Sequence, residues 1–90
     1  MSAQAFYTDD LSNPLSTTFR AFGFGAQLQN IDIRNDDPSS PIYFSYNGTV
    51  IHGKLNPKDL FTIENGNLSS IYVKGTNGGE KYRIFASNFQ

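Results

Sequence analysis

The segment PIYFSYNGTVIHGK, residues 41–54, contains two short alternating runs of apolar and polar residues on either side of Asn47-Gly48. An Asn-Gly pair between such runs is a strong hairpin signal, because a type I′ turn needs positive φ at both of its central residues. Glycine reaches that conformation freely and asparagine tolerates it. The segment therefore predicts a tight hairpin in which Phe44 faces Ile51 and Tyr43 faces His52.

This register divides the hairpin into two faces, because side chains alternate along a strand. The more apolar face, which we assign to the core, carries Ile42, Phe44, Tyr46, Thr49 and Ile51. The opposite face, which we assign to solvent, carries Tyr43, Ser45, Val50 and His52.

The composition limits the classes of protein to which the chain can belong. Its 90 residues are the size of one domain with a thin core. It has no cysteine, which excludes disulfide bonds and thiolate metal sites. Its 7 basic and 8 acidic residues are scattered, so we expect neither nucleic acid nor a membrane surface as a partner. We also see no secretion signal and no apolar run long enough for a transmembrane helix.

Other short runs with strand-like alternation lie on both sides of the hairpin, separated by turn-forming residues. The predicted strands cover residues 17–22, 26–34, 59–64, 70–75 and 80–86. No stretch has the apolar period of a helix. The predicted fold is therefore all-β, a small antiparallel β-sandwich or partly open barrel of about six to seven short strands.

Alternation along these runs also predicts the core. The expected core residues are Phe19, Ile31, Ile33, Ile42, Phe44, Ile51, Phe61, Ile63, Ile71, Val73, Tyr82 and Ile84. The glycines of Gly23-Phe24-Gly25 are expected to break the first of these strands. Leu28 falls out of phase with Ile31, and a bulge near Gln29-Asn30 would explain this.

The first 16 residues differ from the rest, because Phe6, Tyr7 and Leu11 follow no steady period and Pro14 separates them from the first predicted strand. One interpretation is a frayed terminus. The other is an extended arm that orders only when its apolar side chains dock on a partner. We therefore divide the chain into an N-terminal arm, residues 1–16, and a β-sandwich domain, residues 17–90.

The sequence contains no recognisable catalytic motif, so we expect neither an enzyme nor a cofactor. His52 is the single histidine, which excludes a three-histidine zinc site, and we expect it on the surface. The turn at residues 35–40, NDDPSS, is expected to be solvated and not a metal site. Outward-facing Tyr43, Tyr72 and Phe85 are suited either to stacking on sugars or bases or to protein contacts.

From about residue 31 to residue 86 the chain resembles small virion accessory proteins that tailed bacteriophages encode among their structural genes. The resembling segments are IDIRND, PIYFSYNGTVIHGKLNP, SIYVKG and YRIFA, in that order. The resemblance implies a β-sandwich built into the particle, as a capsid decoration protein or as a neck or tail component. It supplies no catalytic residues.

The leading expectation is a non-enzymatic virion structural protein, assembled in the host cytoplasm, that binds the major capsid protein and cements neighbouring capsomers. A head–tail connector or tail adaptor is one alternative, and a carbohydrate-binding surface module is another. Another virion protein or a second copy of the chain are further candidate partners. The expected partner-binding residues are Phe6, Tyr7, Leu11, Tyr43, Tyr72 and Phe85.

Overall fold

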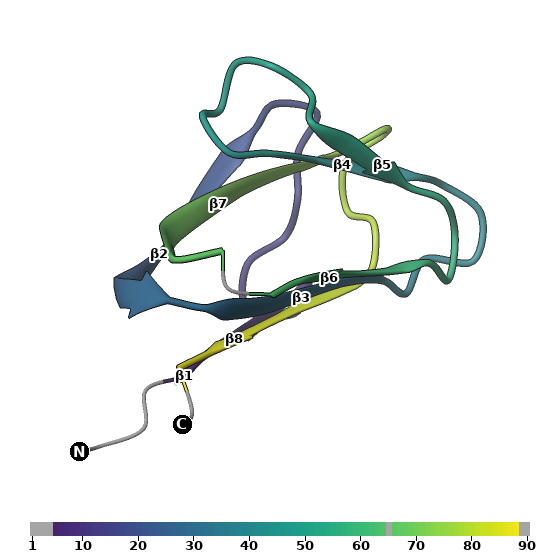
Figure 1. Ribbon diagram of the computed structural model, residues 1–90. Coiled ribbons are helices and arrows are strands. Elements are labelled where there is room, and N and C mark those ends of the chain that lie inside the picture. The colour runs from purple at the N-terminus through teal and green to yellow at the C-terminus, as the bar shows by residue number, and fades with distance from the viewer. Residues whose placement is uncertain (1–4, 65, 89–90) are drawn as a thin grey trace.

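The computed structural model describes residues 5–64 and 66–88, which form eight strands in two four-stranded antiparallel sheets and no helix that could cross a membrane. The strands are β1 (Ala5–Asp9), β2 (Arg20–Leu28), β3 (Asn30–Asn35), β4 (Ile42–Ser45), β5 (Gly53–Leu55), β6 (Leu60–Ile63), β7 (Leu68–Gly75) and β8 (Tyr82–Ser87). The two sheets lie one above the other as two layers (Figure 1). The predicted antiparallel β-sandwich is confirmed, with eight strands in place of the expected six or seven.

The strands pair as a set of nested hairpins: β1 with β8, β2 with β7, β3 with β6 and β4 with β5. Two further pairings, β3 with β8 and β4 with β7, complete the sheets. The resulting orders are β1-β8-β3-β6, called the first sheet below, and β2-β7-β4-β5, called the second sheet. An eight-stranded double sheet that is rolled up in this way is a jelly roll.

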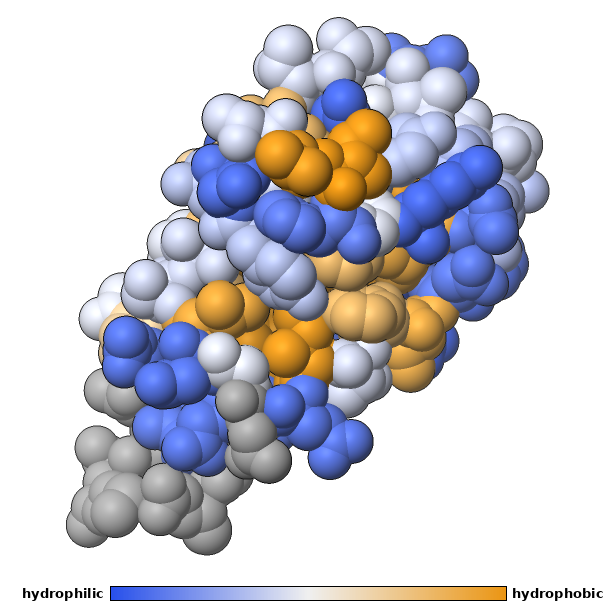
Figure 2. Space-filling model, turned by 45° about the horizontal axis from the view of Figure 1, so that its top comes forward, coloured by the Kyte–Doolittle hydropathy of each residue, from blue (hydrophilic) through white to orange (hydrophobic). Residues whose placement is uncertain are grey.

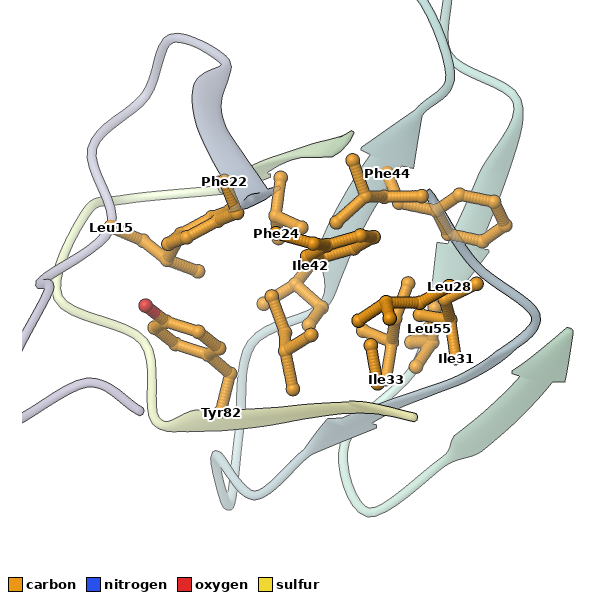
Figure 3. Close-up of a cluster of buried hydrophobic side chains, with 14 residues drawn as sticks. Leu15, Phe22, Phe24, Leu28, Ile31, Ile33, Ile42, Phe44, Leu55 and Tyr82 are labelled. Atoms are coloured by element: carbon orange, nitrogen blue, oxygen red, sulfur yellow. The ribbon is translucent and has the colours of Figure 1, made fainter. Parts of the chain in front are cut away.

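The core fills the space between the sheets, where side chains of both point towards one another (Figure 3). The expected core residues that are buried are Ile31, Ile33, Ile42, Phe44, Ile71, Val73, Tyr82 and Ile84. Two aromatic pairs cross between the sheets. The rings of Phe6 and Phe24 are 5.1 Å apart at one side, and those of Phe44 and Phe61 are 4.7 Å apart.

The facing of the first predicted strand was wrong. Phe22, Phe24 and Leu28 are buried, whereas Phe19 is only half-buried. The glycines do not break the strand, because β2 runs from Arg20 to Leu28 with an irregular register between Gly23 and Leu28. Leu28 is out of phase with Ile31 because β2 and β3 belong to different sheets, and not because of a bulge at Gln29-Asn30.

The predicted arm is also corrected within the described residues. Residues 5–9 form β1, an edge strand paired with β8 from Ala5–Ser87 to Asp9–Arg83. Thr8 and Leu15 are buried, and Phe6 packs against the core. This part of the chain therefore belongs to the sandwich, because a partner strand far away in the sequence supplies its hydrogen bonds. Residues 1–4 of the predicted arm lie outside the described residues.

The buried ring of Tyr82 ties the segment after β1 to the core. Its hydroxyl group donates a hydrogen bond to the carbonyl oxygen of Asn13. Burial raises the pKa of Tyr82 to about 12, so the hydroxyl group keeps its proton and remains a donor. The segment between β1 and β2 is thus held at a fixed position over one end of the sandwich.

A buried carboxylate fixes the turn between β7 and β8. Glu80 accepts hydrogen bonds from the backbone N–H groups of Thr76, Asn77 and Gly78, at 3.0, 2.7 and 2.9 Å. The carboxylate lies against the backbone of Gly75, where a Cβ atom would be 1.9 Å from Glu80 Oε1. Only glycine at position 75 leaves room for this arrangement.

We predict that Gly75→Ala lowers the free energy of unfolding by about 1–3 kcal/mol, because the displaced carboxylate leaves partly buried N–H groups without an acceptor. Gly23→Ala is the matched control, since a Cβ there meets no atom within 4 Å. Chemical denaturation of both variants measures the difference. Equal losses of stability would contradict the role of Glu80.

Candidate binding surfaces

The interior of the sandwich offers no site for chemistry among the described residues. Apolar side chains fill it, and no group of three or more His, Cys, Asp or Glu residues is placed to hold a metal ion within residues 5–64 and 66–88. The buried polar side chains of Asn35, Ser45 and Glu80 are hydrogen-bonded to neighbouring backbone groups. The candidate binding surfaces of the described residues therefore lie on the outside of the sandwich.

The hairpin of β4 and β5 is present, but its predicted register was wrong by two residues. Phe44 lies opposite Gly53 and Tyr43 lies opposite Lys54. A Cβ atom at Gly53 would be 2.2 Å from Cε1 of Phe44, so only glycine fits opposite this ring. The pairing therefore begins further from the turn than a two-residue connection requires, and residues 46–52 form a longer loop.

Side chains within this loop replace the expected type I′ turn. Gly48 has a φ of 82°, but Asn47 is not among the residues with positive φ. The Ser45 hydroxyl accepts the N–H of Gly48 at 2.9 Å, and Asn47 Oδ1 accepts the N–H groups of Thr49 and Val50 at 2.9 and 3.1 Å. These bonds satisfy the backbone locally, so the loop holds its shape without strand pairing.

His52 completes this network at the base of the loop. Its Nδ1 atom accepts the N–H of Tyr46 at 3.0 Å, and the two rings lie 4.8 Å apart. The side chain is exposed, as expected, but it lies beside Tyr46 and not opposite Tyr43. The histidine therefore has a structural role in the loop.

The loop carries three exposed apolar side chains, which we call the apolar tip: Tyr46, Val50 and Ile51. They are exposed by 41%, 54% and 49%. The assignment of Tyr46, Thr49 and Ile51 to the core was wrong, because residues 46–52 leave the strand pairing and form a loop in which these three side chains are exposed. Figure 2, which turns the side of this loop towards the viewer, shows a compact hydrophobic area bordered by hydrophilic residues.

A second surface lies on the outer face of the first sheet, where the strand register places side chains in two rows. The aromatic row consists of Tyr7, Phe85, Asp32 and Thr62, directly opposite one another on β1, β8, β3 and β6. The arginine row consists of Asp9, Arg83, Arg34 and Leu60 on the same strands. Six of these residues line a shallow groove of about 250 Å³: Tyr7, Asp32, Arg34, Leu60, Arg83 and Phe85.

The groove contains both paired and unpaired charges. Arg83 donates to both carboxylate oxygens of Asp36, at 2.6 and 3.1 Å, and this bond together with the negative charge raises the pKa of Arg83. Within the part of the chain that the structure describes, neither Asp32 nor Arg34 has a side-chain hydrogen bond or ion pair. One cation and one carboxylate are therefore available to an outside partner.

The tyrosine at the edge of the groove is linked to the end of β1. Its hydroxyl group donates to Asp9 Oδ2 at 3.2 Å. Desolvation, followed by this bond and the charge of Asp9, raises the pKa of Tyr7. Asp9 also accepts the N–H groups of Ser12 and Leu11, and mainly through the Ser12 bond the pKa of Asp9 is lowered.

The predicted acidic turn after β3 is held by its own backbone. Asp37 accepts the N–H groups of Ser39 and Ser40 at 3.1 and 2.8 Å, and these bonds lower its pKa. Its neighbour Asp36 is engaged with Arg83. Both carboxylates therefore have structural partners, as expected for a turn.

The six residues predicted to bind a partner do not form one surface. Tyr7 and Phe85 meet in the groove, and Leu11, exposed by 87%, lies in the turn that follows β1. Phe6 faces the core and contributes to packing. The structure thus brings together two of the six, and the joint exposure of Tyr46, Val50 and Ile51 was not predicted.

Tyr43 and Tyr72 lie on the outer face of the second sheet, where both are half-buried. Lys74 Nζ lies between the rings of Phe19 and Tyr43, at 4.8 and 5.8 Å from their centroids. The backbone of Gly48 covers the ring of Tyr72, since a Cβ there would be 3.0 Å away. Both tyrosines thus serve packing within the protein.

Known structures show a likeness in fold. A de novo designed double-stranded β-helix matches with a TM-score of 0.52 and 11% identity over 98% of this chain and 100% of that chain. HppE, crystallised in its FeII form with substrate, matches with a TM-score of 0.51 and 13% identity. This match covers 98% of the present chain but 47% of HppE, so the chain spans about half the length of that protein.

A tobacco streak virus coat protein matches at a TM-score of 0.39 and 11% identity, over 94% of this chain and 87% of that one, which is too distant to support an argument. No protein-family model and no curated protein matches the sequence. At these identities the likeness defines a jelly roll of the double-stranded β-helix type, and no activity follows from it.

We predict that Asn47→Ala loosens the loop, because the N–H groups of Thr49 and Val50 lose their acceptor. Their amide hydrogens should exchange faster while those of β4 and β7 remain protected. Asn56→Ala is the control, because its side chain has no hydrogen-bond partner among the described residues. Unchanged exchange at both amides in Asn47→Ala would show that other contacts shape the loop.

Proposed function

We propose that this chain is a non-enzymatic virion structural protein of the capsid decoration type, which binds the major capsid protein. The observation that carries the proposal is the combination of a filled apolar interior with large apolar side chains on the outside. Such surface side chains are suited to contacts with another protein. The sequence resemblance to bacteriophage virion accessory proteins supplies the setting in which these contacts would be made.

The fold is compatible with this role by analogy, since jelly rolls occur in viral capsid domains and also in lectins and cupins. A small sandwich is suited to repeated attachment at equivalent sites on a shell. Many weak contacts on one particle would give stable occupancy. Under this proposal the protein is located in the virion, on the capsid shell.

The apolar tip is the surface that we assign to the capsid contact. Val50 and Ile51 are adjacent and about half exposed, so burying the remaining exposed surface of each contributes about 1 kcal/mol. The hydrogen bonds of Ser45 and Asn47 already hold the loop. Binding therefore orders little additional chain, which lowers its entropic cost.

Two other functions differ in what they predict. A head–tail connector or tail adaptor would occupy a single ring, so its copy number would be far below that of the major capsid protein. A carbohydrate-binding module would use the groove, where the ring of Phe85 and the side chains of Asp32 and Arg34 offer a stacking surface and polar partners. Glycan-array binding that Phe85→Ala abolishes would favour this second alternative.

We predict that Ile51→Asp prevents incorporation into virus particles without unfolding the protein, because it places a charge in the apolar contact. Leu11→Asp is the control, since Leu11 is even more exposed but lies away from the tip. Mass-calibrated gels of purified particles measure the copies relative to the major capsid protein. Decoration predicts a copy number on the scale of the capsomers for the wild type and for Leu11→Asp.

Three results would contradict this proposal. Absence of the wild-type chain from particles would exclude a virion role. A copy number that corresponds to a single ring would place the protein at the neck or tail. If Ile51→Asp is incorporated normally and Leu11→Asp is not, the capsid contact lies at the turn after β1 and not at the apolar tip.

A further inference from the structure

The two rows on the outer face of the first sheet are complementary to each other. The aromatic row runs Tyr7, Phe85, Asp32, Thr62 across the sheet, and the arginine row runs Asp9, Arg83, Arg34, Leu60 beside it. Each member of one row is thus two residues from a member of the other on the same strand. We propose that this face binds a second copy of the chain, with the aromatic row of each copy against the arginine row of the other.

The required symmetry is a two-fold axis that lies in the interface, between the first sheets of the two copies. The axis is perpendicular to the strands and passes between the aromatic row and the arginine row. This operation stacks each strand on its own copy in the opposite direction, as in an isologous dimer. Asp32 then faces Arg34 of the second copy, and the same pair forms again on the other side of the axis. The carboxylate of Asp32 and the guanidinium of Arg34, which have no side-chain partner among residues 5–64 and 66–88, thus become partners between chains.

The remaining members of the rows also match under this operation. Phe85 faces the second copy's Arg83, a pairing in which a guanidinium lies over an aromatic ring. Tyr7 faces the second copy's Asp9, so its hydroxyl group has the same kind of acceptor that it uses within its own chain, at 3.2 Å. At the edge, the apolar Leu60 meets the methyl group of Thr62.

The charges also disfavour a dimer whose two-fold axis is parallel to the strands. An axis parallel to the strands would place Asp32 against Asp32, or Arg83 against Arg34, because those residues lie directly opposite each other on β8 and β3. Like charges in an interface cost several kcal/mol, so this arrangement is disfavoured. These charges lie on β8 and β3, the two central strands of the first sheet. Packed sheets are rotated relative to each other by their twist, and this rotation displaces residues at the centre of the interface least.

The contact area is small, because two rows on four strands form it. Stable interfaces bury roughly 800 Å² on each partner, and smaller ones are transient. We therefore expect a dimer in equilibrium with the monomer. The loop of the apolar tip lies on the far side of the sandwich from the first sheet (Figure 1), so the two tips of a dimer would point in opposite directions.

Charge reversal tests the arrangement through a specific pattern. Asp32→Arg gives a face with arginine at both positions, and Arg34→Asp gives one with aspartate at both. Each variant should repel its own copies and dimerise at least about tenfold more weakly than the wild type. An equimolar mixture of the two should form a heterodimer, because every facing pair is then Asp with Arg. Analytical ultracentrifugation over a range of concentrations measures each case.

Lys54→Asp, an exposed charge reversal on the second sheet, is the control and should leave dimerisation unchanged. Thermal melting confirms that all variants are folded, as expected for substitutions outside the core. A wild-type chain that stays monomeric up to millimolar concentration would overturn the proposal. So would single variants that dimerise like the wild type, or a mixture that dimerises no better than its components. These outcomes are independent of the capsid contact, because no particle takes part.

Discussion

The buried side-chain amide of Asn35 joins the two sheets at one end of the sandwich. Its Nδ2 group donates to the carbonyl oxygens of Ser40 and Leu55, at 2.9 and 3.0 Å, and its Oδ1 accepts the N–H of Asp37. Asn35 ends β3 in the first sheet, whereas Leu55 ends β5 in the second. Each buried polar group left unpaired would cost about 1–3 kcal/mol, so this position tolerates neither an apolar nor a longer side chain. This amide therefore ties the end of β3 to the end of β5 across the sandwich.

A sandwich joined in this way leaves its two outer sides for function. The apolar tip belongs to a loop of the second sheet, and the groove with its two rows lies on the first sheet, so the two surfaces face different directions (Figure 1). A protein that contacts the shell with one surface and its own copy with the other would link neighbouring sites. Both proposals therefore describe the same mechanical role, although each stands on its own observations.

Alternation was sufficient to predict the antiparallel sandwich and most of its core, because pairs such as Ile31 and Ile33 point to the same face in any strand. It failed where contacts distant in sequence decide the outcome. β1 has no clear apolar alternation, and its pairing with β8 depends on the other end of the chain. In β2 the facing of Phe22 was wrong and Gly23-Phe24-Gly25 was expected to break the strand, because local sequence does not show which face meets the first sheet.

The surfaces were harder to predict than the fold. Asn47-Gly48 indicated a tight turn, yet Ser45 and Asn47 satisfy the backbone within a longer loop, and Gly53 sets the pairing by giving room to Phe44. Those small polar residues are the signal that would have indicated the loop. The two rows arise from the register of four strands, so no single stretch of sequence contains them.

Native-state hydrogen exchange tests most directly whether residues 5–88 form one cooperative scaffold that leaves function to its surface. Joined sheets and a paired β1 predict that the hydrogen-bonded amides of β1, β3, β4, β7 and β8 share one opening free energy, close to that of global unfolding. Amides of β1 that exchange as fast as those of an unfolded chain would contradict this structure. They would show that the start of the chain is a free arm and that β8 is an exposed edge.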